Sequence, residues 1–391
     1  MRDKTKLVTV GRDKAATGAS VNPRIARAST ILFDSVADMQ RAFAGKDQGV
    51  EFYGRRGTQT TFALTQAMRQ LENAAGSYIY PCGTAAITAA LQSFLAAGDH
   101  LLVVDSVYEP TREFCDGTLA RFGVETTYYD PLVGADIIEL IKPNTKVIFL
   151  ESPGSLTMEV QDVPALAHVA RQRGITTIID NTYASPLNFK PLDVGVDIVV
   201  HSATKYLNGH SDVMLGVASA TESHWPQLQA RSYELGLCTS VDDIYTTLRG
   251  LRTLDVRLRE QASNAKTIAD WLSSHEAVDH LRHPAFATCP GHEYFVRDMA
   301  GASGLFAFVL KQNQTAAVNA MVDGMRYFKL GFSWGGYESL ILAASSFKRR
   351  RTATAWDESK CLVRLSIGLE DPQDLIDDLR DGLDRYAEAL Q

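Results

Sequence analysis

Lys205 lies in a segment whose residue types suit nucleophilic chemistry. The apolar run Ile198 to Val200 predicts a short buried strand, and Ser202, Thr204 and Lys205 follow it closely. A lysine at the end of a buried strand is partly desolvated, which lowers the pKa of its amine and favours the nucleophilic form. Ser202 and Thr204 could bond a phosphate, and Lys205 could form a Schiff base with an aldehyde cofactor. The alternative is a lysine that only extends from a strand end into solvent.

A tight turn from Pro81 to Thr84 could hold the phosphate of such a cofactor. It follows a predicted strand at 77–80 and opens a predicted helix at 85–95. Gly83 and Thr84 at a helix start direct free backbone N–H groups and the positive end of the helix dipole toward an anion. Strand–glycine–helix junctions are common, so an ordinary turn is the alternative.

Arginines in two other segments could also bind anions. Arg55 and Arg56 stand between glycines beside Tyr53, and a guanidinium offers a fork of donors to phosphate. Arg364 lies inside an apolar strand pattern, where it needs an anionic partner such as a substrate carboxylate. A surface turn is the alternative for the first segment, and a structural ion pair is the alternative for Arg364.

Polar side chains also follow two other predicted strands. Tyr108 comes after the run at 101–105, and Asp180 ends the run at 175–179. Because the carboxyl ends of parallel strands meet at one edge of a sheet, we expect both beside Lys205. A buried Asp180 is costly as a charge unless it is paired, and a protonated ring nitrogen would be one such partner. A turn-forming or capping aspartate is the alternative.

The elements that would position these side chains alternate along the chain. Short apolar runs between helical patterns indicate βα units and an α/β fold with a mostly parallel central sheet. We expect strands at 77–80, 101–105, 124–129, 146–150, 175–180, 198–200 and 214–220, and helices at 35–43, 62–74, 85–95, 111–122, 135–141, 163–173 and 222–235.

The pattern changes toward the C-terminus. A largely helical segment at 241–272, with Gly250 as its predicted break, leads into strands and helices of a smaller α+β domain. The strands are expected at 277–282, 303–310 and 361–367, and the helices at 314–322 and 373–390. We therefore expect an N-terminal arm over 1–50, an α/β domain over 51–250 and a C-terminal α+β domain over 251–391.

Length and composition are those of a soluble protein of two or three domains, with 391 residues, 45% apolar and 22% charged. The net charge of −7 argues against nucleic-acid binding, and the basic cluster Lys348 to Arg351 is predicted to be a solvated loop. No stretch has the length of a membrane span, and no secretory signal is recognised. Five scattered cysteines without CxxC spacing favour the reducing cytoplasm and indicate no metal site.

Taken together, these segments resemble the pyridoxal-phosphate enzymes of cysteine and methionine metabolism over nearly the whole chain. The resemblance rests on the motifs YGRRGT at 53–58, PCGTAA at 81–86, YEP at 108–110, ESPGSLTMEVQDVP at 151–164, DNTYA at 180–184, ATKYLNGHSD at 203–212, SWGGYESL at 333–340 and RLSIGLED at 364–371. It implies fold type I of the pyridoxal-phosphate enzymes, pyridoxal 5'-phosphate as cofactor, and a homotetramer of two active dimers.

The resemblance also implies a role for each matching residue. Lys205 would be the Schiff-base lysine, Asp180 the partner of the pyridine nitrogen and Tyr108 the residue stacked on the ring. The phosphate would be held by Gly83, Thr84, Ser202 and Thr204, and by Tyr53 and Arg55 of the neighbouring subunit. The substrate would be bound by Arg364, Ser333 and Trp334, with Tyr233 approaching the neighbouring site.

The activity implied is that of a carbon–sulfur lyase of methionine biosynthesis, which cleaves L-cystathionine by β-elimination to homocysteine, pyruvate and ammonia. Lys205 and Tyr108 would move the α-proton. Phe332 favours β-cleavage, because γ-acting relatives usually carry glutamate there and β-lyases an aromatic residue. Tyr183 stands where close relatives commonly carry tryptophan. The alternatives are a β-lyase of cystine or cysteine S-conjugates, a cystathionine or methionine γ-lyase and, more remotely, a non-catalytic cofactor-binding regulator.

Overall fold

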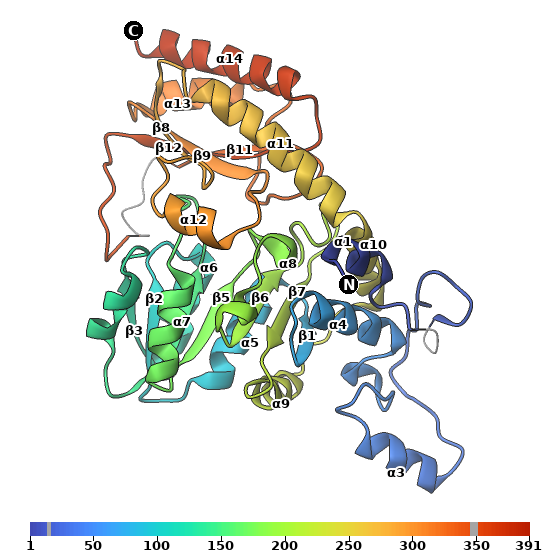
Figure 1. The fold of residues 1–391 in the computed structure, drawn as a ribbon. Helices are drawn as coiled ribbons and strands as arrows, with labels where there is room; N and C mark the ends of the chain where they lie inside the picture. Colours follow the sequence, from blue (N-terminus) through green and yellow to red (C-terminus); the bar gives the residue numbers. More distant parts are fainter. Residues whose placement is uncertain (14–16, 345–350) are drawn as a thin grey trace.

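Two sheets organise the chain, a seven-stranded sheet and a five-stranded sheet formed by the C-terminal part (Figure 1). The computed structural model describes residues 1–13, 17–344 and 351–391. This arrangement confirms the expected α/β fold with a smaller α+β part.

The larger sheet has the order β1-β7-β6-β5-β4-β2-β3. Its strands are β1 (Gly76–Tyr80), β2 (His100–Val104), β3 (Glu125–Tyr129), β4 (Thr145–Glu151), β5 (Thr176–Asp180), β6 (Ile198–Ser202) and β7 (Gly216–Ala220). β7 is antiparallel to β1 and β6, whereas the remaining pairs are parallel. The mostly parallel sheet predicted from the apolar runs is therefore confirmed.

Helices cover this sheet, which explains why its central strands are apolar on both faces. They are α4 (Gln59–Leu71), α5 (Gly83–Phe94), α6 (Glu109–Phe114), α7 (Val163–Gln172), α8 (Ser185–Asn188) and α9 (Trp225–Leu235), with a π-helical turn at Cys115–Leu119 and 3-10 turns at Gly54–Arg56, Gly134–Leu140 and Pro191–Val194. The helix expected at 111–122 is thus present over 109–121, with the π-helical turn inside it. All five residues of β2 are buried.

The smaller sheet has the order β10-β11-β12-β9-β8, with only β10–β11 parallel among the described strands. Its strands are β8 (Val278–Arg282), β9 (Leu305–Leu310), β10 (Lys329–Leu330), β11 (Leu340–Ala344) and β12 (Cys361–Ser366). Helices α11 (Leu254–Leu272), α13 (Thr315–Asp323) and α14 (Pro372–Ala389) lie together over this sheet, and α12 (His292–Asp298) lies nearer the larger sheet (Figure 1).

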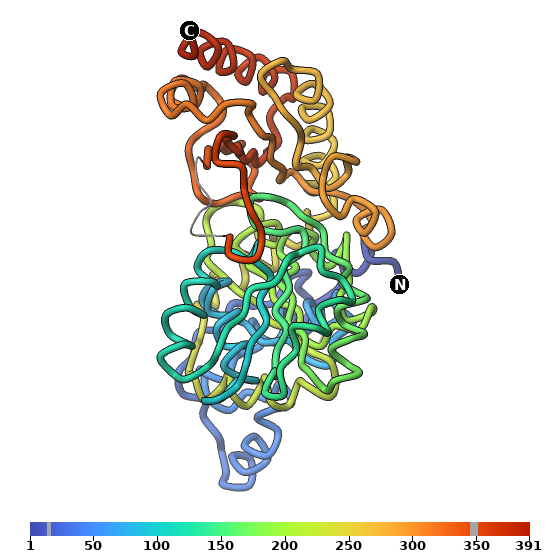
Figure 2. Tube along the Cα trace, turned by 90° about the vertical axis from the view of Figure 1, so that its left-hand side faces the viewer, coloured from blue at the N-terminus to red at the C-terminus, as the bar shows by residue number. Residues whose placement is uncertain are grey.

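The N-terminal residues divide between a packed helix and a projecting one. Leu7 of α1 (Asp3–Thr9) is buried in a cluster with residues of α4 and of α10 (Val241–Arg252). By contrast, α3 (Val36–Ala44), the helix predicted at 35–43, extends away from both sheets (Figures 1 and 2).

Two expectations are corrected. The helical segment 241–272 breaks at Thr253, which separates α10 from α11, and Gly250 lies inside α10. A Cβ at Gly250 would stand 2.2 Å from the carbonyl oxygen of Asn208, so this glycine permits close packing. The basic cluster is not a wholly solvated loop, because the Arg351 side chain is 6% exposed and pairs with Glu159. Residues 348–350 lie outside the described part.

Within residues 1–13, 17–344 and 351–391, no helix is both long and apolar enough to span a membrane. The same residues contain no group of three or more histidine, cysteine, aspartate or glutamate side chains arranged to hold a metal ion.

Candidate active site

A cavity of about 270 Å³ opens at the carboxyl ends of the parallel strands, where the larger sheet faces the smaller one. Sequence-predicted residues from many separate segments meet there: Gly83, Thr84, Tyr108, Asp180, Ser202, Thr204, Lys205, Ser333, Trp334 and Arg364. This convergence is the geometry expected of a ligand site in an open α/β sheet.

Lys205 follows β6 and presents its amine to the cavity. Its Nζ donates to the Ser333 hydroxyl at 2.8 Å and lies 5.3 Å from the centre of the Trp334 ring. Burial and the nearby Arg364 guanidinium lower the pKa of Lys205 to about 8, although Asp180 acts in the opposite direction. A substantial fraction of neutral amine is therefore present near neutral pH, as nucleophilic attack on an aldehyde requires.

Asp180 ends β5 and is buried beside the cavity. The backbone N–H of Thr182 donates to its Oδ1 at 2.9 Å, and the Thr182 hydroxyl donates to the same oxygen. Burial raises the pKa of Asp180, even though the Thr182 hydrogen bonds lower it. A cation placed in the cavity would offset this cost of burial, and a protonated ring nitrogen is such a cation.

Tyr108 occupies the N-cap position of α6, and the residue is 43% exposed at the cavity. Its backbone N–H donates to Oε2 of Glu151 at 2.7 Å, and Glu151 stands opposite Asp180 in the β4–β5 register. Burial and the Asp180 charge raise the pKa of Glu151 well above that of an ordinary carboxyl group. Two neighbouring carboxyl groups in a partly enclosed site do not both ionise readily, so the charged one is the one that gains a cation.

The N-terminus of α5 forms a second wall of the cavity. Gly83 is its first residue, and a Cβ there would lie 2.6 Å from Cβ of Ser202. Only glycine allows this helix start to approach the end of β6 so closely. The backbone N–H of Ser202 donates to the Thr182 hydroxyl, while the Thr204 hydroxyl already exchanges hydrogen bonds with the backbone of Leu215.

Arg364 extends from β12 toward the turn that precedes β11. Its Nη2 donates to the carbonyl oxygens of Gly331, Phe332 and Ser333, each at 3.1 Å. These bonds fix the turn that carries Ser333 and Trp334 into the cavity. Phe332 also lines the cavity, with its side chain 87% exposed.

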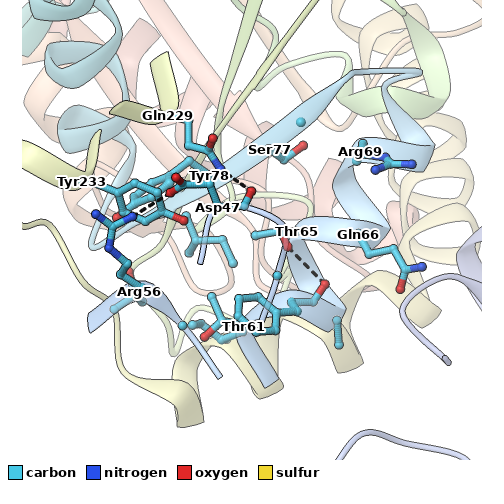
Figure 3. Close-up of a pocket in the computed structure, with 18 of the residues that line it drawn as sticks. Asp47, Arg56, Thr61, Thr65, Gln66, Arg69, Ser77, Tyr78, Gln229 and Tyr233 are labelled. Atoms are coloured by element: carbon cyan, nitrogen blue, oxygen red, sulfur yellow. Dashed lines mark hydrogen bonds and ion pairs between the residues drawn. The ribbon is translucent and has the colours of Figure 1, made fainter. Parts of the chain in front are cut away.

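Three predicted residues lie elsewhere in the chain. Tyr53 is 44% exposed, and Arg55 donates to the Tyr233 carbonyl oxygen at 2.9 Å beside a separate pocket of about 540 Å³. Figure 3 shows Arg56 and Tyr233 on one side of this pocket, with Arg56 paired to Asp47 at 2.7 Å. Tyr53, Arg55 and Tyr233 therefore do not line the Lys205 cavity of their own chain. Their contribution to a neighbouring subunit stays a prediction.

Some cavity residues were not assigned a role from the sequence. Thr182 could have been found, because a hydroxyl residue two positions after an aspartate at a strand end is typical of a side-chain turn. Glu151 begins the motif at 151–164 and ends β4, and neither feature by itself assigns it a role. Met214 and Leu305 line the cavity through tertiary packing and carry no local signal.

These side chains fit a phosphorylated pyridine aldehyde. The donor set supplies an amine of lowered pKa for the aldehyde and a buried carboxyl group for a ring nitrogen. The α5 N-terminus, narrowed by Gly83 against Ser202, supplies backbone N–H groups for a phosphate.

The comparison with known proteins agrees with this donor set. The chain matches the sequence model of the Cys/Met metabolism PLP-dependent enzymes over residues 4–384. It is 44% identical over 395 residues to a cystathionine beta-lyase of Haemophilus influenzae, covering 98% of each protein. It is 46% identical over 389 residues to that of Escherichia coli, covering 97% of this chain and 98% of the relative.

Among solved structures, cystathionine gamma synthase from Xanthomonas oryzae pv. oryzae in complex with cystathionine superposes with a TM-score of 0.90. It is 34% identical in sequence, and the match covers 99% of each chain. By its sequence over nearly the full length and by its fold, the chain belongs to the pyridoxal-phosphate-dependent enzymes of cysteine and methionine metabolism.

Proposed function

We propose that this protein is a cystathionine β-lyase, a carbon–sulfur lyase that cleaves L-cystathionine to homocysteine, pyruvate and ammonia. The observation that carries the proposal is the cavity in which an amine of lowered pKa, a buried aspartate and a buried arginine meet. Full-length identity to cystathionine β-lyases supports the substrate.

Pyridoxal phosphate, when bound, supplies an electron sink for the bonds at the substrate Cα. Lys205 would hold its aldehyde carbon, and Asp180 would balance the positive charge at its ring nitrogen. Gly83, Thr84, Ser202 and Thr204 would bind its phosphate.

The chain's own groups then position the substrate and move its protons. Arg364 binds the α-carboxylate, with Ser333 and Trp334 completing that wall. The Lys205 amine would act as the base that removes the Cα proton, and Tyr108 lies beside it at the cavity. The Cβ–S bond breaks, homocysteine leaves as a thiol after gaining a proton, and water converts the remaining three-carbon fragment to pyruvate and ammonia.

Phe332 supports β-cleavage over γ-cleavage. The γ-acting enzymes of the family that the sequence resembles usually carry a glutamate at this position. Phe332 brings only an apolar ring to that rim of the cavity. Tyr183, also at the cavity and buried, leaves less apolar bulk than a tryptophan would, so cystine and other cysteine S-conjugates are secondary substrates.

The assembly belongs to the same proposal. Tyr53 and Arg55 lie outside their own cavity, so we place them at the phosphate of a neighbouring subunit within a homotetramer of two active dimers. Tyr233 shares the Arg55 surface and approaches the neighbouring site. The proposal also divides the chain into an N-terminal arm over 1–50, a cofactor-binding domain over 51–250 and a C-terminal domain over 251–391. It places the protein in the cytoplasm.

Incubation of the purified protein and pyridoxal phosphate with L-cystathionine tests the proposal. We expect pyruvate and homocysteine in equal amounts. The appearance of 2-oxobutyrate with cysteine instead would establish γ-cleavage and refute the argument from Phe332. Bound cofactor without any keto acid product would refute cystathionine as the substrate, and cystine and other cysteine S-conjugates would then be tested in the same assay.

A further inference from the structure

The carboxylate of Asp105 binds a backbone segment that is distant in sequence. Asp105 follows β2 and is fully buried. Its Oδ1 accepts the N–H of Thr352 at 2.9 Å, and its Oδ2 accepts the N–H groups of Ala353 at 3.0 Å and Thr354 at 2.9 Å. The hydroxyls of Thr352 and Thr354 donate at 3.1 and 3.0 Å. One side chain of the larger sheet thus holds a turn that leads to β12 of the smaller sheet.

A buried ion pair completes this contact. Nη2 of Arg112 lies 2.7 Å from Oδ1 of Asp105, with the two side chains 4% and 0% exposed. Burial acts to raise the pKa of Asp105, but the hydrogen bonds from Thr352, Arg112 and Thr354 outweigh it and hold that pKa below its ordinary value. The carboxylate is therefore charged at neutral pH. Its two oxygens accept hydrogen bonds from Arg112 and from the backbone N–H groups of 352–354 at the same time.

The same C-terminal segment has two further anchors, and we call residues 351–356 the strap. Arg351 pairs with Oε1 of Glu159 at 2.7 Å and also donates to the Thr157 hydroxyl. Trp356 packs against the apolar cluster that contains Leu156, a residue of the cavity wall. The segment that leads into β12 starts beside the larger sheet and runs from there to the smaller one (Figure 2).

Both attachments lead to walls of the cavity. The Ser106 carbonyl, next to Asp105, accepts the N–H of Ser155 at 2.8 Å, and Ser155 lines the cavity. Tyr108 lies three residues beyond Asp105, and its N–H is held by Glu151. The turn that carries the Tyr108 ring is thus fixed at one end by Glu151 and at the other by the strap.

We propose that Asp105 is a positioning residue, which holds the Tyr108 turn against the strap and so sets the Tyr108 ring over the bound cofactor. The inference rests on the proposed function, because it assigns Tyr108 a place at the reacting atoms. The new element is the contact between Asp105 and the strap, which joins the two sheets and on which the position of the Tyr108 ring depends.

Asp105→Asn tests the inference. Each carboxylate oxygen accepts at least two N–H groups, so the asparagine amide turns an NH₂ group toward such donors in either orientation. Asp377→Asn is the matched control, because Asp377 is an exposed aspartate on α14 with local partners. The measurements are kcat per cofactor-loaded site, KM for cystathionine, and the visible circular dichroism of the bound cofactor, all well below the unfolding temperature.

We expect Asp105→Asn to lower kcat per loaded site about tenfold or more, with a smaller change in KM, and to alter the visible dichroism. Asp377→Asn should change none of these. A purely structural role would lower the unfolding temperature of Asp105→Asn yet leave kcat per loaded site and the dichroism unchanged, and that result would overturn the inference.

Thr354→Val keeps the inference testable if Asp105→Asn does not fold. It removes one hydroxyl donor to Asp105, and we expect a smaller loss of kcat, about threefold, with a dichroism change in the same direction. An unchanged dichroism and kcat in this variant would also refute the inference. Failure of the proposed function can be told apart from failure of this inference. In the first case the unmodified protein would lack β-cleavage, while the visible dichroism of the variant and the unmodified protein would still report on the Tyr108 ring.

Discussion

Substitution of Gly83 by alanine tests whether the narrow contact between α5 and β6 forms the phosphate site. An alanine Cβ would lie 2.6 Å from Cβ and 2.7 Å from Oγ of Ser202, against about 3.4 Å for an ordinary contact, so one wall must move by about 0.8 Å. Ser202 Cα would lie 3.0 Å away, so rotation of the serine side chain does not relieve the contact.

The cost follows from this geometry. Inserting a methyl group into a packed interior costs about 1–3 kcal/mol, while replacing a glycine by alanine returns about 0.4–1 kcal/mol through the unfolded state. Displacement of the α5 N-terminus also moves the N–H groups that face the phosphate. The unfolded-state gain affects folding and not cofactor binding, so the strain of about 1–3 kcal/mol sets the effect on affinity. We therefore expect Gly83→Ala to weaken cofactor binding about 5- to 140-fold, since 1.4 kcal/mol corresponds to a factor of ten.

The assay is a titration of the apoprotein with pyridoxal phosphate, followed by visible absorbance, together with thermal unfolding. Gly117→Ala is the matched control, because its Cβ would meet no atom within 4 Å. The double variant Gly83→Ala/Ser202→Gly removes the side chain that the new Cβ meets. Its affinity for the cofactor should therefore be higher than the two single substitutions predict when their effects are multiplied. Equal affinity and stability of Gly83→Ala and Gly117→Ala would refute the reasoning.

Three further predictions concern the cavity. The apoprotein should bind pyridoxal phosphate covalently at a rate that rises with pH through a midpoint near 8, the pKa of Lys205, because only the neutral amine attacks the aldehyde. Stopped-flow absorbance measures this rate at a series of pH values, and a midpoint near 10 would contradict the prediction. Asp180→Asn should keep the cofactor bound but lower kcat about 10²- to 10³-fold, since the buried charge that balances the ring nitrogen is lost; steady-state kinetics on loaded enzyme measures it. Arg364→Lys should raise KM about 10- to 100-fold with a smaller effect on kcat, because a lysine lacks the fork that binds a carboxylate, and initial rates against cystathionine concentration check this.

Much of the fold and the cavity could be predicted because the signals are local. The apolar runs that precede Tyr108 and Lys205, and the run that ends in Asp180, predict parallel strands. The geometry of such sheets brings their carboxyl ends together. Gly83, the first residue of α5, also gives a local signal for an anion site. The first backbone N–H groups of a helix have no partner within the helix and can bind an anion.

The remainder depends on contacts between distant segments. Asp105 and Thr352 are 247 residues apart, and neither sits in a pattern that names the other. Gly250 has the sequence signature of a break but serves close packing against Asn208, which only the tertiary structure determines. Arg351 belongs to a basic cluster typical of solvent, yet Glu159 offers it a buried partner.

The most direct test of the account is to locate the bound cofactor. The protein is reduced with borohydride in the presence of pyridoxal phosphate, digested, and analysed by mass spectrometry. We expect a phosphopyridoxyl group on Lys205. In Lys205→Ala we expect both this label and cystathionine cleavage to be lost. A label on another lysine, or undiminished turnover in Lys205→Ala, would contradict the account.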